Sequence, residues 1–413
     1  MNVEVVTIGT ELLLGYTMDT NGADLGRGLA AAGAEVVRRT AVPDRPDAVR
    51  AAVAEALDRT GFVLTTGGLG PTRDDLTKRV VADLLGRPLV LDQAVLRALE
   101  ARFRRFGRAM PESNRGQAEV PVGAVVLANP RGTAPGLWLE DDRGRTVVML
   151  PGVPSEMRGL LAEEVLPRLA GRAAGTVVLS RTLRTTGVPE SALAERIGPI
   201  EDEIAPLSLA YLPGPDGVDL RLTAWGLDRA GAERGLEDAV ARLRPRLGEH
   251  CYGEADADLA AVVLDALRVR RRRLAVAESC TGGLLGQRLT AVPGASDVFV
   301  GGVVAYADDV KREHLRVPGE IIETHGAVSE ETARAMAEGA CRAFGVPCAL
   351  AITGVAGPSG GTPEKPVGTV WLAGRVDGET RAAKRVFPGD RGEIRYRGAQ
   401  AALDLVRRML GER

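Results

Sequence analysis

The stretch FVLTTGGLGPTRDD, residues 62–75, joins a run of strand-forming residues to a glycine-rich loop that ends in two carboxylates. A short apolar run bounded by glycine is typical of a buried strand. Similar runs occur on both sides of it, and helical patterns lie between them. Alternating strands and helices indicate a parallel sheet with right-handed crossovers and helices on both faces. The predicted strands are residues 3–8, 35–39, 62–66 and 146–150, and the predicted helices are 23–32, 47–58, 75–85 and 155–169.

A chain of 413 residues is too long for one ordinary hydrophobic core, so we expect several domains. After residue 170 the order becomes strand, helix, two strands and helix, which is typical of a split βαβ unit. A second α/β pattern follows. The predicted fold class is therefore α/β, with two three-layer α/β domains joined by a small α+β, KH-like middle domain. The predicted domains span residues 1–170, 171–252 and 253–413.

The segment Gly214-Pro215-Asp216-Gly217 matches the GxxG loop of KH domains as a string. A phosphate-clamping KH loop joins helices, whereas this segment lies between two predicted strands, so we interpret it as a hairpin turn. The acidic residues 201–203 favour a spacer or dimerisation role for this domain over RNA binding. Residues 253–256 are predicted to be a linker. The arginine run 270–273 is predicted to be a solvated turn at a helix C-terminus.

Composition excludes several classes of protein. A net charge of −2 and an aromatic content of 3% argue against a general nucleic-acid or anionic-membrane binder. The four cysteines form no CxxC pair and only three histidines occur, so the chain has no recognisable zinc site and no disulfide framework. No apolar run approaches the ~20 residues of a membrane span, and the first residues lack a basic leader region. We expect a cytoplasmic protein without membrane contacts.

Lysine is rare in this chain: only four of the 53 Lys and Arg residues are lysine. Arginine stays protonated in proteins, whereas a desolvated lysine can lose its proton. Lys311 follows Ser279 by one helix and one strand, and the serine lies at a predicted strand-to-helix turn. This order suggests a Ser-Lys hydrolase, in which lysine activates the serine. The alternative for Ser279 is a helix N-cap.

Three loops of the last domain follow predicted secondary-structure ends, where open α/β sheets bind ligands. They are residues 279–283, 353–361 and 388–391. Their glycines allow backbone N–H groups to approach a ligand, and a helix N-terminus favours an anion.

The last domain resembles the C-terminal domain of CinA-like proteins, on the motifs at residues 277–283, 306–311, 325–329, 353–358 and 367–371. That domain is similar to nicotinamide mononucleotide (NMN) deamidase, which releases ammonia and needs no cofactor. The resemblance implies Ser279 as nucleophile, Lys311 as general base and Tyr306 in the same site. Backbone N–H groups near Thr281 and Gly282 are expected to hold the oxyanion. Cys280 is the rival nucleophile. The predicted substrate-binding residues of this site are Thr281, Gly282, Gly283, Thr353, Gly354 and Arg391.

The first domain resembles the molybdopterin-binding fold in the version fused within CinA-like proteins, on the motifs at residues 9–15, 19–21 and 65–75. In that context the resemblance implies a metal-dependent ADP-ribose pyrophosphatase that yields AMP and ribose 5-phosphate. Asp74 and Asp75 are predicted to bind Mg²⁺ or Mn²⁺, because hard carboxylate oxygens suit these ions. The alternative for this pair is a helix N-cap. The predicted substrate-binding residues are Gly9, Thr10, Glu11, Asn21, Gly67, Gly68 and Gly70.

These expectations combine into a bifunctional hydrolase of pyridine-nucleotide salvage, acting on NMN and ADP-ribose and forming a homodimer. Two alternatives stay open. One keeps the first domain as a pterin-binding module without pyrophosphatase activity. The other is a competence or DNA-damage accessory protein that binds DNA. The net charge of −2 and the few aromatic residues argue against this second alternative.

Overall fold

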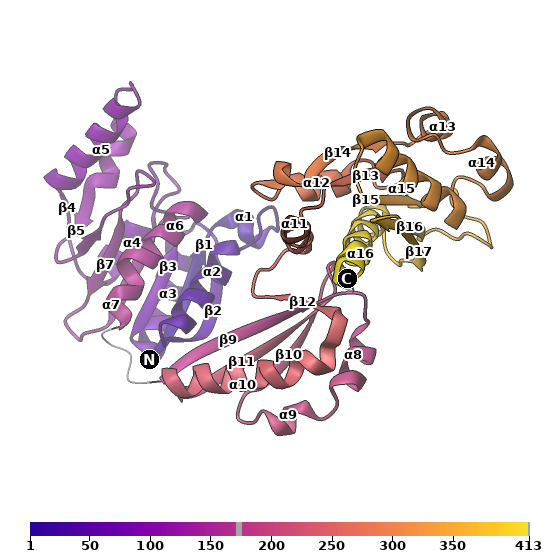
Figure 1. The fold of residues 1–413 in the computed structure, drawn as a ribbon. Coiled ribbons are helices and arrows are strands. Elements are labelled where there is room, and N and C mark those ends of the chain that lie inside the picture. The colour runs from indigo at the N-terminus through magenta and orange to yellow at the C-terminus, as the bar shows by residue number, and fades with distance from the viewer. Residues whose placement is uncertain (171–175, 412–413) are drawn as a thin grey trace. The chain divides into compact units, whose positions relative to one another are not determined.

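The computed structural model describes residues 1–170 and 176–411. The chain divides into two compact units, residues 1–179 with 224–234, and residues 180–223 with 235–413. The predicted boundary between the first two domains adjoins residues 171–175, which lie outside the described residues. Figure 1 labels the helices and strands of each part. Among the described residues, no helix combines the length and the apolar character needed to cross a membrane.

The N-terminal sheet has six strands in the order β2-β1-β3-β8-β7-β6. The first four are parallel, as the sequence predicts, whereas β7 and β6 run antiparallel to their neighbours. The sheet is therefore mixed, and the expectation of a wholly parallel sheet is wrong at this edge. Its strands are β1 (Asn2–Ile8), β2 (Glu35–Val42), β3 (Phe62–Thr66), β6 (Val125–Leu127), β7 (Gly136–Glu140) and β8 (Thr146–Leu150).

Helices cover both faces of this sheet, because alternate strand residues belong to different core clusters. Val63 packs with α3 and α4 on one face, whereas Leu64 packs with α2 and α6 on the other. The two clusters give the three-layer arrangement that the sequence predicts. The helices are α1 (Thr10–Leu13), α2 (Thr20–Ala31), α3 (Pro46–Thr60), α4 (Thr77–Leu84), α5 (Gln93–Arg105), α6 (Pro154–Leu160) and α7 (Leu166–Ala170), and a small second sheet pairs β4 (Leu89–Leu91) with β5 (Glu119–Pro121).

The middle module has a four-stranded sheet in the order β10-β11-β9-β12. Gly214 and Gly217 hydrogen-bond each other across the β10–β11 hairpin, which confirms the predicted turn. Residues 251–254 form strand β12 and pair antiparallel with β9, so the predicted linker at residues 253–256 is wrong. The elements are β9 (Thr176–Thr185), α8 (Glu190–Ile197), α9 (Ile200–Glu203), β10 (Ser208–Pro213), β11 (Val218–Asp228), α10 (Arg229–Leu247) and β12 (Cys251–Glu254).

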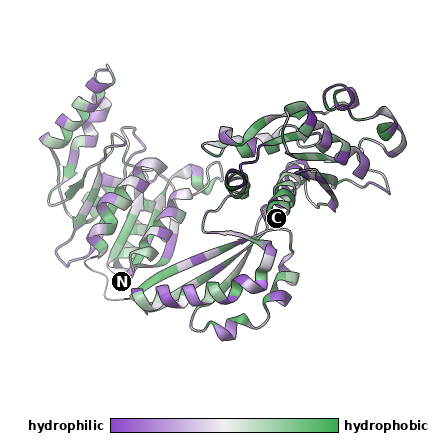
Figure 2. Cartoon of the chain, viewed as in Figure 1, coloured by the Kyte–Doolittle hydropathy of each residue, from purple (hydrophilic) through white to green (hydrophobic). Residues whose placement is uncertain are grey.

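The C-terminal sheet has the order β14-β13-β15-β16-β17, in which β14, β13 and β15 are parallel and β16 and β17 antiparallel. On β13, Val276 faces α11, α12 and α16, whereas Ala275 and Ala277 face α13, α14 and α15. Apolar residues concentrate on the central strands in Figure 2. The strands are β13 (Leu274–Glu278), β14 (Phe299–Val304), β15 (Cys348–Gly354), β16 (Thr369–Val376) and β17 (Glu379–Val386), and the helices are α11 (Leu259–Arg270), α12 (Leu284–Thr290), α13 (Asp308–Leu315), α14 (Gly319–His325), α15 (Glu330–Phe344) and α16 (Arg391–Gly411).

The arginine run lies at the end of α11, where Arg271 adopts a left-handed backbone with φ 52°. Arg268 pairs with Asp265 and Asp297, and Arg272 pairs with Asp377. Because Arg268 and Arg272 already have carboxylate partners, the segment agrees with the predicted turn at a helix C-terminus.

Candidate functional site

Ser279 is the first residue after β13, and the backbone holds it at the carboxyl end of the sheet. Its N–H donates to the carbonyl of Ile352 on β15, 2.9 Å away. Its own carbonyl accepts from the Gly282 N–H at 3.0 Å. Gly282 and Gly283 have φ of 58° and 93°, a region that residues with a Cβ rarely adopt. The loop therefore needs both glycines to turn from strand to helix directly after Ser279.

The buried carboxylate of Glu278 satisfies the first N–H groups of α12. It accepts hydrogen bonds from the N–H groups of Gly283, Leu285 and Gly286 at 3.0, 3.0 and 2.8 Å. A negative charge at a helix N-terminus is also favourable for the helix dipole. Glu278 thus performs the capping role considered as the alternative for Ser279, and that alternative is wrong. The Ser279 side chain makes no capping hydrogen bond to α12.

The predicted oxyanion donors need one correction. The Gly282 N–H is occupied by the Ser279 carbonyl, and the Gly283 N–H is occupied by Glu278. In residues 1–170 and 176–411, the N–H groups of Cys280 and Thr281 donate to no other residue. The Thr281 hydroxyl is also buried without a hydrogen-bond partner in this part of the chain. The available donors are therefore the N–H groups of Cys280 and Thr281, whereas the prediction named those near Thr281 and Gly282.

Cys280 belongs to the hydrophobic core and not to the exposed surface of the loop. Its side chain is 6% exposed and packs in the cluster that includes Leu285 and Ile352. Burial raises the pKa of the Cys280 thiol to about 12. Since the thiolate is the nucleophilic form of cysteine, Cys280 is a poor nucleophile near neutral pH.

Lys311, on α13, is one of the largest fully buried side chains, with 1% exposure. Its Nζ donates to the carbonyl of Tyr306 at 3.2 Å and to Asp308 Oδ1 at 3.1 Å. Asp308 was not predicted from the sequence. Across the described residues, Lys311 Nζ makes no hydrogen bond to Ser279. The two residues nevertheless belong to the same sheet edge, because Glu278 pairs with Val304 two residues before Tyr306.

Arg391, the first residue of α16, links two of the predicted loops. Its Nη1 donates to the carbonyl of Gly357 at 2.6 Å, and its Nη2 donates to the Tyr306 hydroxyl at 3.1 Å. Arg395, one turn later, donates to the carbonyl of Thr281. Helix α16 therefore contacts the loops after β13, β14 and β15. The two remaining predicted residues lie at the end of β15, where the Thr353 hydroxyl donates to Ala327 and Gly354 approaches the Thr369 carbonyl.

In the N-terminal unit, the loop after β3 also depends on glycine. A Cβ on Gly67 would lie 2.2 Å from the Ile8 carbonyl oxygen, and one on Gly68 would lie 2.2 Å from Thr77 Oγ1. The loop backbone is therefore packed against β1 and the start of α4, which exposes its remaining N–H groups to a ligand.

The loop carboxylates do not cap α4. Helix α4 begins at Thr77, and Asp75 accepts hydrogen bonds from the N–H and hydroxyl of Thr72. The N-cap alternative is therefore wrong for Asp75. A cavity of about 320 Å³ is lined by Gly68, Gly70 and Asp75. Three cations that sequence reasoning did not assign to this site line it as well: Arg73, Lys78 and Arg79.

Lys78 lies in a partly desolvated position beside this loop. Its Nζ donates to the carbonyl of Gly116 at 2.6 Å. Burial lowers the pKa of Lys78 to about 8. Lys78 therefore adds a cation whose charge changes near physiological pH.

Two of the other predicted residues of this domain, Glu11 and Asn21, line a smaller hollow of about 110 Å³. Asn21 Nδ2 donates to Thr66 Oγ1 at 3.0 Å and to the Gly152 carbonyl at 2.7 Å, and its Oδ1 is buried without a donor in the described chain. The N–H and the hydroxyl of Thr10 both donate to Asp44 Oδ2 instead. The neighbouring Gly9 donates its N–H to the Val42 carbonyl.

The carboxylates fit a divalent cation only if the substrate supplies further ligands. Within the described ranges, no three His, Cys, Asp or Glu side chains gather into a metal site. Asp74 and Asp75 nevertheless offer two oxygen donors beside a loop suited to phosphates. Mg²⁺ commonly binds through one or two carboxylates together with substrate phosphates and water, so this donor set suits it.

Comparisons with known proteins cover the whole chain. Three family models match: "Probable molybdopterin binding domain" at residues 4–171, "Damage-inducible protein CinA KH domain" at residues 180–253, and "CinA C-terminal domain" at residues 256–410. A CinA-like protein of Gemmatimonas aurantiaca is 57% identical over 99% of this chain and 96% of its own length. A CinA-like protein of Salinibacter ruber is 43% identical over 99% and 100% of the two chains. A putative competence-damage inducible protein of Symbiobacterium thermophilum is 44% identical over 99% of each. The chain belongs to the CinA-like proteins.

Proposed function

We propose that the chain is a bifunctional nucleotide hydrolase, which deamidates NMN at Ser279 and cleaves ADP-ribose at the loop after β3. The observation that carries the first activity is the capping of α12 by Glu278. Because Glu278 makes that contact, the Ser279 side chain does not cap α12; Ser279 lies at the carboxyl end of parallel strands, on the same sheet edge as the buried Lys311.

The deamidation follows the chemistry of a base-activated nucleophile. Neutral Lys311 takes the proton of Ser279, whose Oγ forms a bond to the carboxamide carbon of NMN. The N–H groups of Cys280 and Thr281 stabilise the oxyanion. The C–N bond breaks, and ammonia leaves with a proton returned by Lys311. Water then attacks the acyl carbon and gives up a proton to Lys311. The bond between the acyl carbon and Ser279 Oγ breaks, and Lys311 returns the proton to Oγ, so that nicotinic acid mononucleotide and free Ser279 result.

Other residues of this site hold the substrate. Arg391 bridges the Gly357 carbonyl and the Tyr306 hydroxyl, so its guanidinium lies where two loops meet. A planar guanidinium is suited to phosphate, and Tyr306, which is 59% exposed, offers a ring surface to the nicotinamide or ribose. Lys311 keeps its orientation through Asp308 and the Tyr306 carbonyl.

The second activity is supported by the loop after β3. Its glycine backbone suits a diphosphate, and Arg73, Lys78 and Arg79 supply positive charge around the cavity. Asp74 and Asp75 would hold the divalent cation, which neutralises phosphate charge and polarises the phosphoryl oxygens when bound. AMP and ribose 5-phosphate are the products.

The test separates the two activities by substrate, metal and residue. Purified full-length protein is incubated with NMN, and ammonia is measured; in parallel it is incubated with ADP-ribose and Mg²⁺, and AMP is measured. We expect both products from the wild-type chain. EDTA and Asp75→Ala should abolish AMP formation and leave ammonia release unchanged, because a Ser-Lys hydrolase needs no metal. Loss of both activities with EDTA, or the absence of both products from folded protein, would contradict the proposal.

A further inference from the structure

The second unit contains a cavity of about 700 Å³ that is distinct from both candidate catalytic sites. Two loops of the middle module, residues 186–189 and 213–218, form one wall. The ends of β17 and the face of α16 form the other. Small-molecule sites in proteins commonly have volumes of about 300–1,000 Å³, so this cavity is large enough for a ligand.

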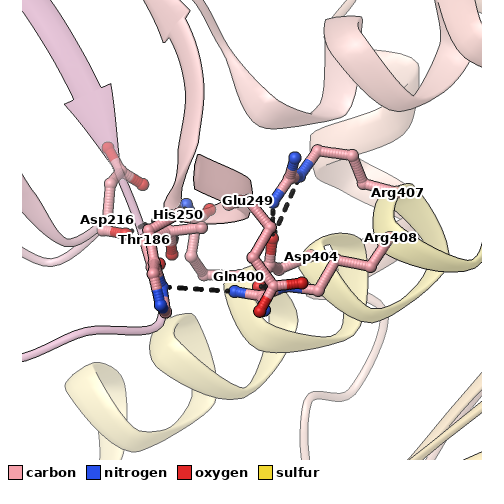
Figure 3. Close-up of polar contacts among 8 residues, drawn as sticks. All are labelled: Thr186, Asp216, Glu249, His250, Gln400, Asp404, Arg407 and Arg408. Carbon is pink, nitrogen blue, oxygen red and sulfur yellow. Dashed lines mark hydrogen bonds and ion pairs between the residues drawn. The ribbon is translucent and has the colours of Figure 1, made fainter. Parts of the chain in front are cut away.

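A polar network fixes the two walls relative to each other, as Figure 3 shows. Asp404, on α16, is buried and accepts hydrogen bonds from Arg407 and Arg408. Arg408 also reaches His250, with 3.4 Å between its Nη2 and His250 Nδ1. His250 Nδ1 in turn lies 3.2 Å from the carbonyl of Thr186. The cavity is therefore preformed, which reduces the ordering cost of binding a ligand.

The carboxylates that line the cavity are already engaged. Asp404 bonds two arginines, and Asp216 pairs with Arg184 and accepts from Tyr396. The charged side chains of the lining that lack such a close partner are arginines.

Two arginines carry that charge. Arg385 donates to the carbonyl of Lys384, and its guanidinium has no carboxylate within ion-pair distance in the described chain. Arg397 donates to the carbonyl of Pro388, and its ion pair with Glu393, at 3.9 Å, is longer than the 2.9 Å pair of Asp216 with Arg184. Arginines with free guanidinium donors recognise phosphate through charge-assisted hydrogen bonds.

The rest of the lining suits a flat ring with a polar edge. Val188, Phe387 and Leu405 supply an apolar surface. Gln400 lies on the wall and is 3% exposed. Its Nε2 donates to Thr186 Oγ1 and to the carbonyl of Asp216, whereas its Oε1 is buried without a donor in residues 1–170 and 176–411. An acceptor in this state is suited to an exocyclic amino or amide N–H of a ring.

We infer that this cavity binds a small organic phosphate of the mononucleotide class, with the phosphate on Arg385 and Arg397 and the ring against Phe387 and Gln400. The inference does not depend on the proposed hydrolase activities, because none of the residues that line the cavity belongs to either candidate catalytic site.

The test uses AMP as the probe and hydrogen–deuterium exchange of the full-length protein as the local readout. AMP should slow amide exchange in the loops 186–189 and 213–218, whereas adenosine and inorganic phosphate at the same concentration should not. A double variant, Arg385→Ser with Arg397→Ser, should raise the AMP concentration for half-maximal protection at least about tenfold, since each charge-assisted bond to phosphate contributes on that scale.

The matched control is Lys384→Ser. Lys384 is an exposed cation next to Arg385 on β17 but does not line the cavity. Its removal should leave the protection unchanged. Protection that is confined to the loops 67–75 or 279–283, that persists in the double variant, or that adenosine reproduces would overturn the inference.

Discussion

The two candidate catalytic sites occupy equivalent places, at the carboxyl ends of parallel strands, but they use the glycine loop after the strand in opposite ways. After β13, the buried Glu278 consumes the N–H groups of the helix start, and chemistry is left to side chains. After β3, Asp75 accepts from the N–H and hydroxyl of Thr72, and the Gly67 N–H donates to the Leu150 carbonyl. In the described chain, the N–H groups of Gly68, Leu69 and Gly70 donate to no other residue.

The difference teaches that a glycine-rich loop does not by itself define an anion site. What decides its use is whether a protein carboxylate already occupies its donors. In the described chain, the β13 loop keeps the N–H groups of Cys280 and Thr281 without a partner. It shares its sheet edge with the buried Lys311, as a nucleophile site requires. The β3 loop is bordered by cations and carboxylates, as a site for a metal-bound diphosphate requires.

The largest expected effect comes from removing the nucleophile on one side of this comparison. Ser279→Ala should lower kcat for NMN deamidation by at least about 10³-fold, because no other group can form the acyl-enzyme. AMP formation from ADP-ribose should be unaffected. The measurement is the rate of ammonia release at saturating NMN, with circular dichroism as the control for folding. Residual deamidation within about tenfold of wild type would assign the chemistry to another residue.

A smaller effect should follow from Glu278→Ala, which removes the cap of α12 but not the nucleophile. Three buried N–H groups lose their acceptor, so the free energy of unfolding should fall by about 1–3 kcal/mol. Deamidation should also decline, because the orientation of Ser279 depends on this loop. Urea denaturation of the full-length chain measures the loss. Glu330→Ala, a change at a half-buried position in the first turn of α15 that removes one ion pair with Arg334, is the control and should cost much less.

The smallest effect should come from Cys280→Ala, which changes the kcat of deamidation by less than about tenfold. Burial raises the pKa of this thiol to about 12, so the thiolate is scarce in the folded protein at any pH well below that value. Iodoacetamide at pH 8 should therefore modify Cys280 only after unfolding, when its pKa returns to its ordinary value of about 8.5. Mass spectrometry of the labelled peptide measures this. Rapid labelling in the folded state, with loss of deamidation, would favour the cysteine.

Local sequence patterns predicted the elements whose periodicity is strong. The strand at residues 62–66, the helix at residues 47–58 and the hairpin at Gly214–Gly217 all have boundaries marked by glycine or proline. The antiparallel strands β6 and β7 were missed, since strand direction depends on a partner distant in sequence. Strand β12 was taken for a linker because its four residues include glycine and gain their order from β9.

The residues of the candidate site were also predicted only in part. Ser279, Tyr306 and Arg391 follow secondary-structure boundaries, and the contacts of Arg391 bring two of their loops together. Glu278 and Asp308 carry no such signal. A carboxylate that accepts from N–H groups five to eight residues later, or one that orients a lysine within the same helix turn, is an ordinary charged residue in the sequence. Lys78 stood out only through the rarity of lysine.

The account depends most on Lys311 acting as the base for Ser279, and Lys311→Arg is the most direct test. The guanidinium keeps the positive charge and approximate reach, but it cannot accept a proton near neutral pH. The kcat for NMN deamidation should fall about as far as in Ser279→Ala, and the double variant should lose little more, because the two residues act as one unit. A Lys311→Arg enzyme with near-normal kcat, a raised KM and an unchanged pH profile would contradict the dyad and make Lys311 a phosphate-binding cation.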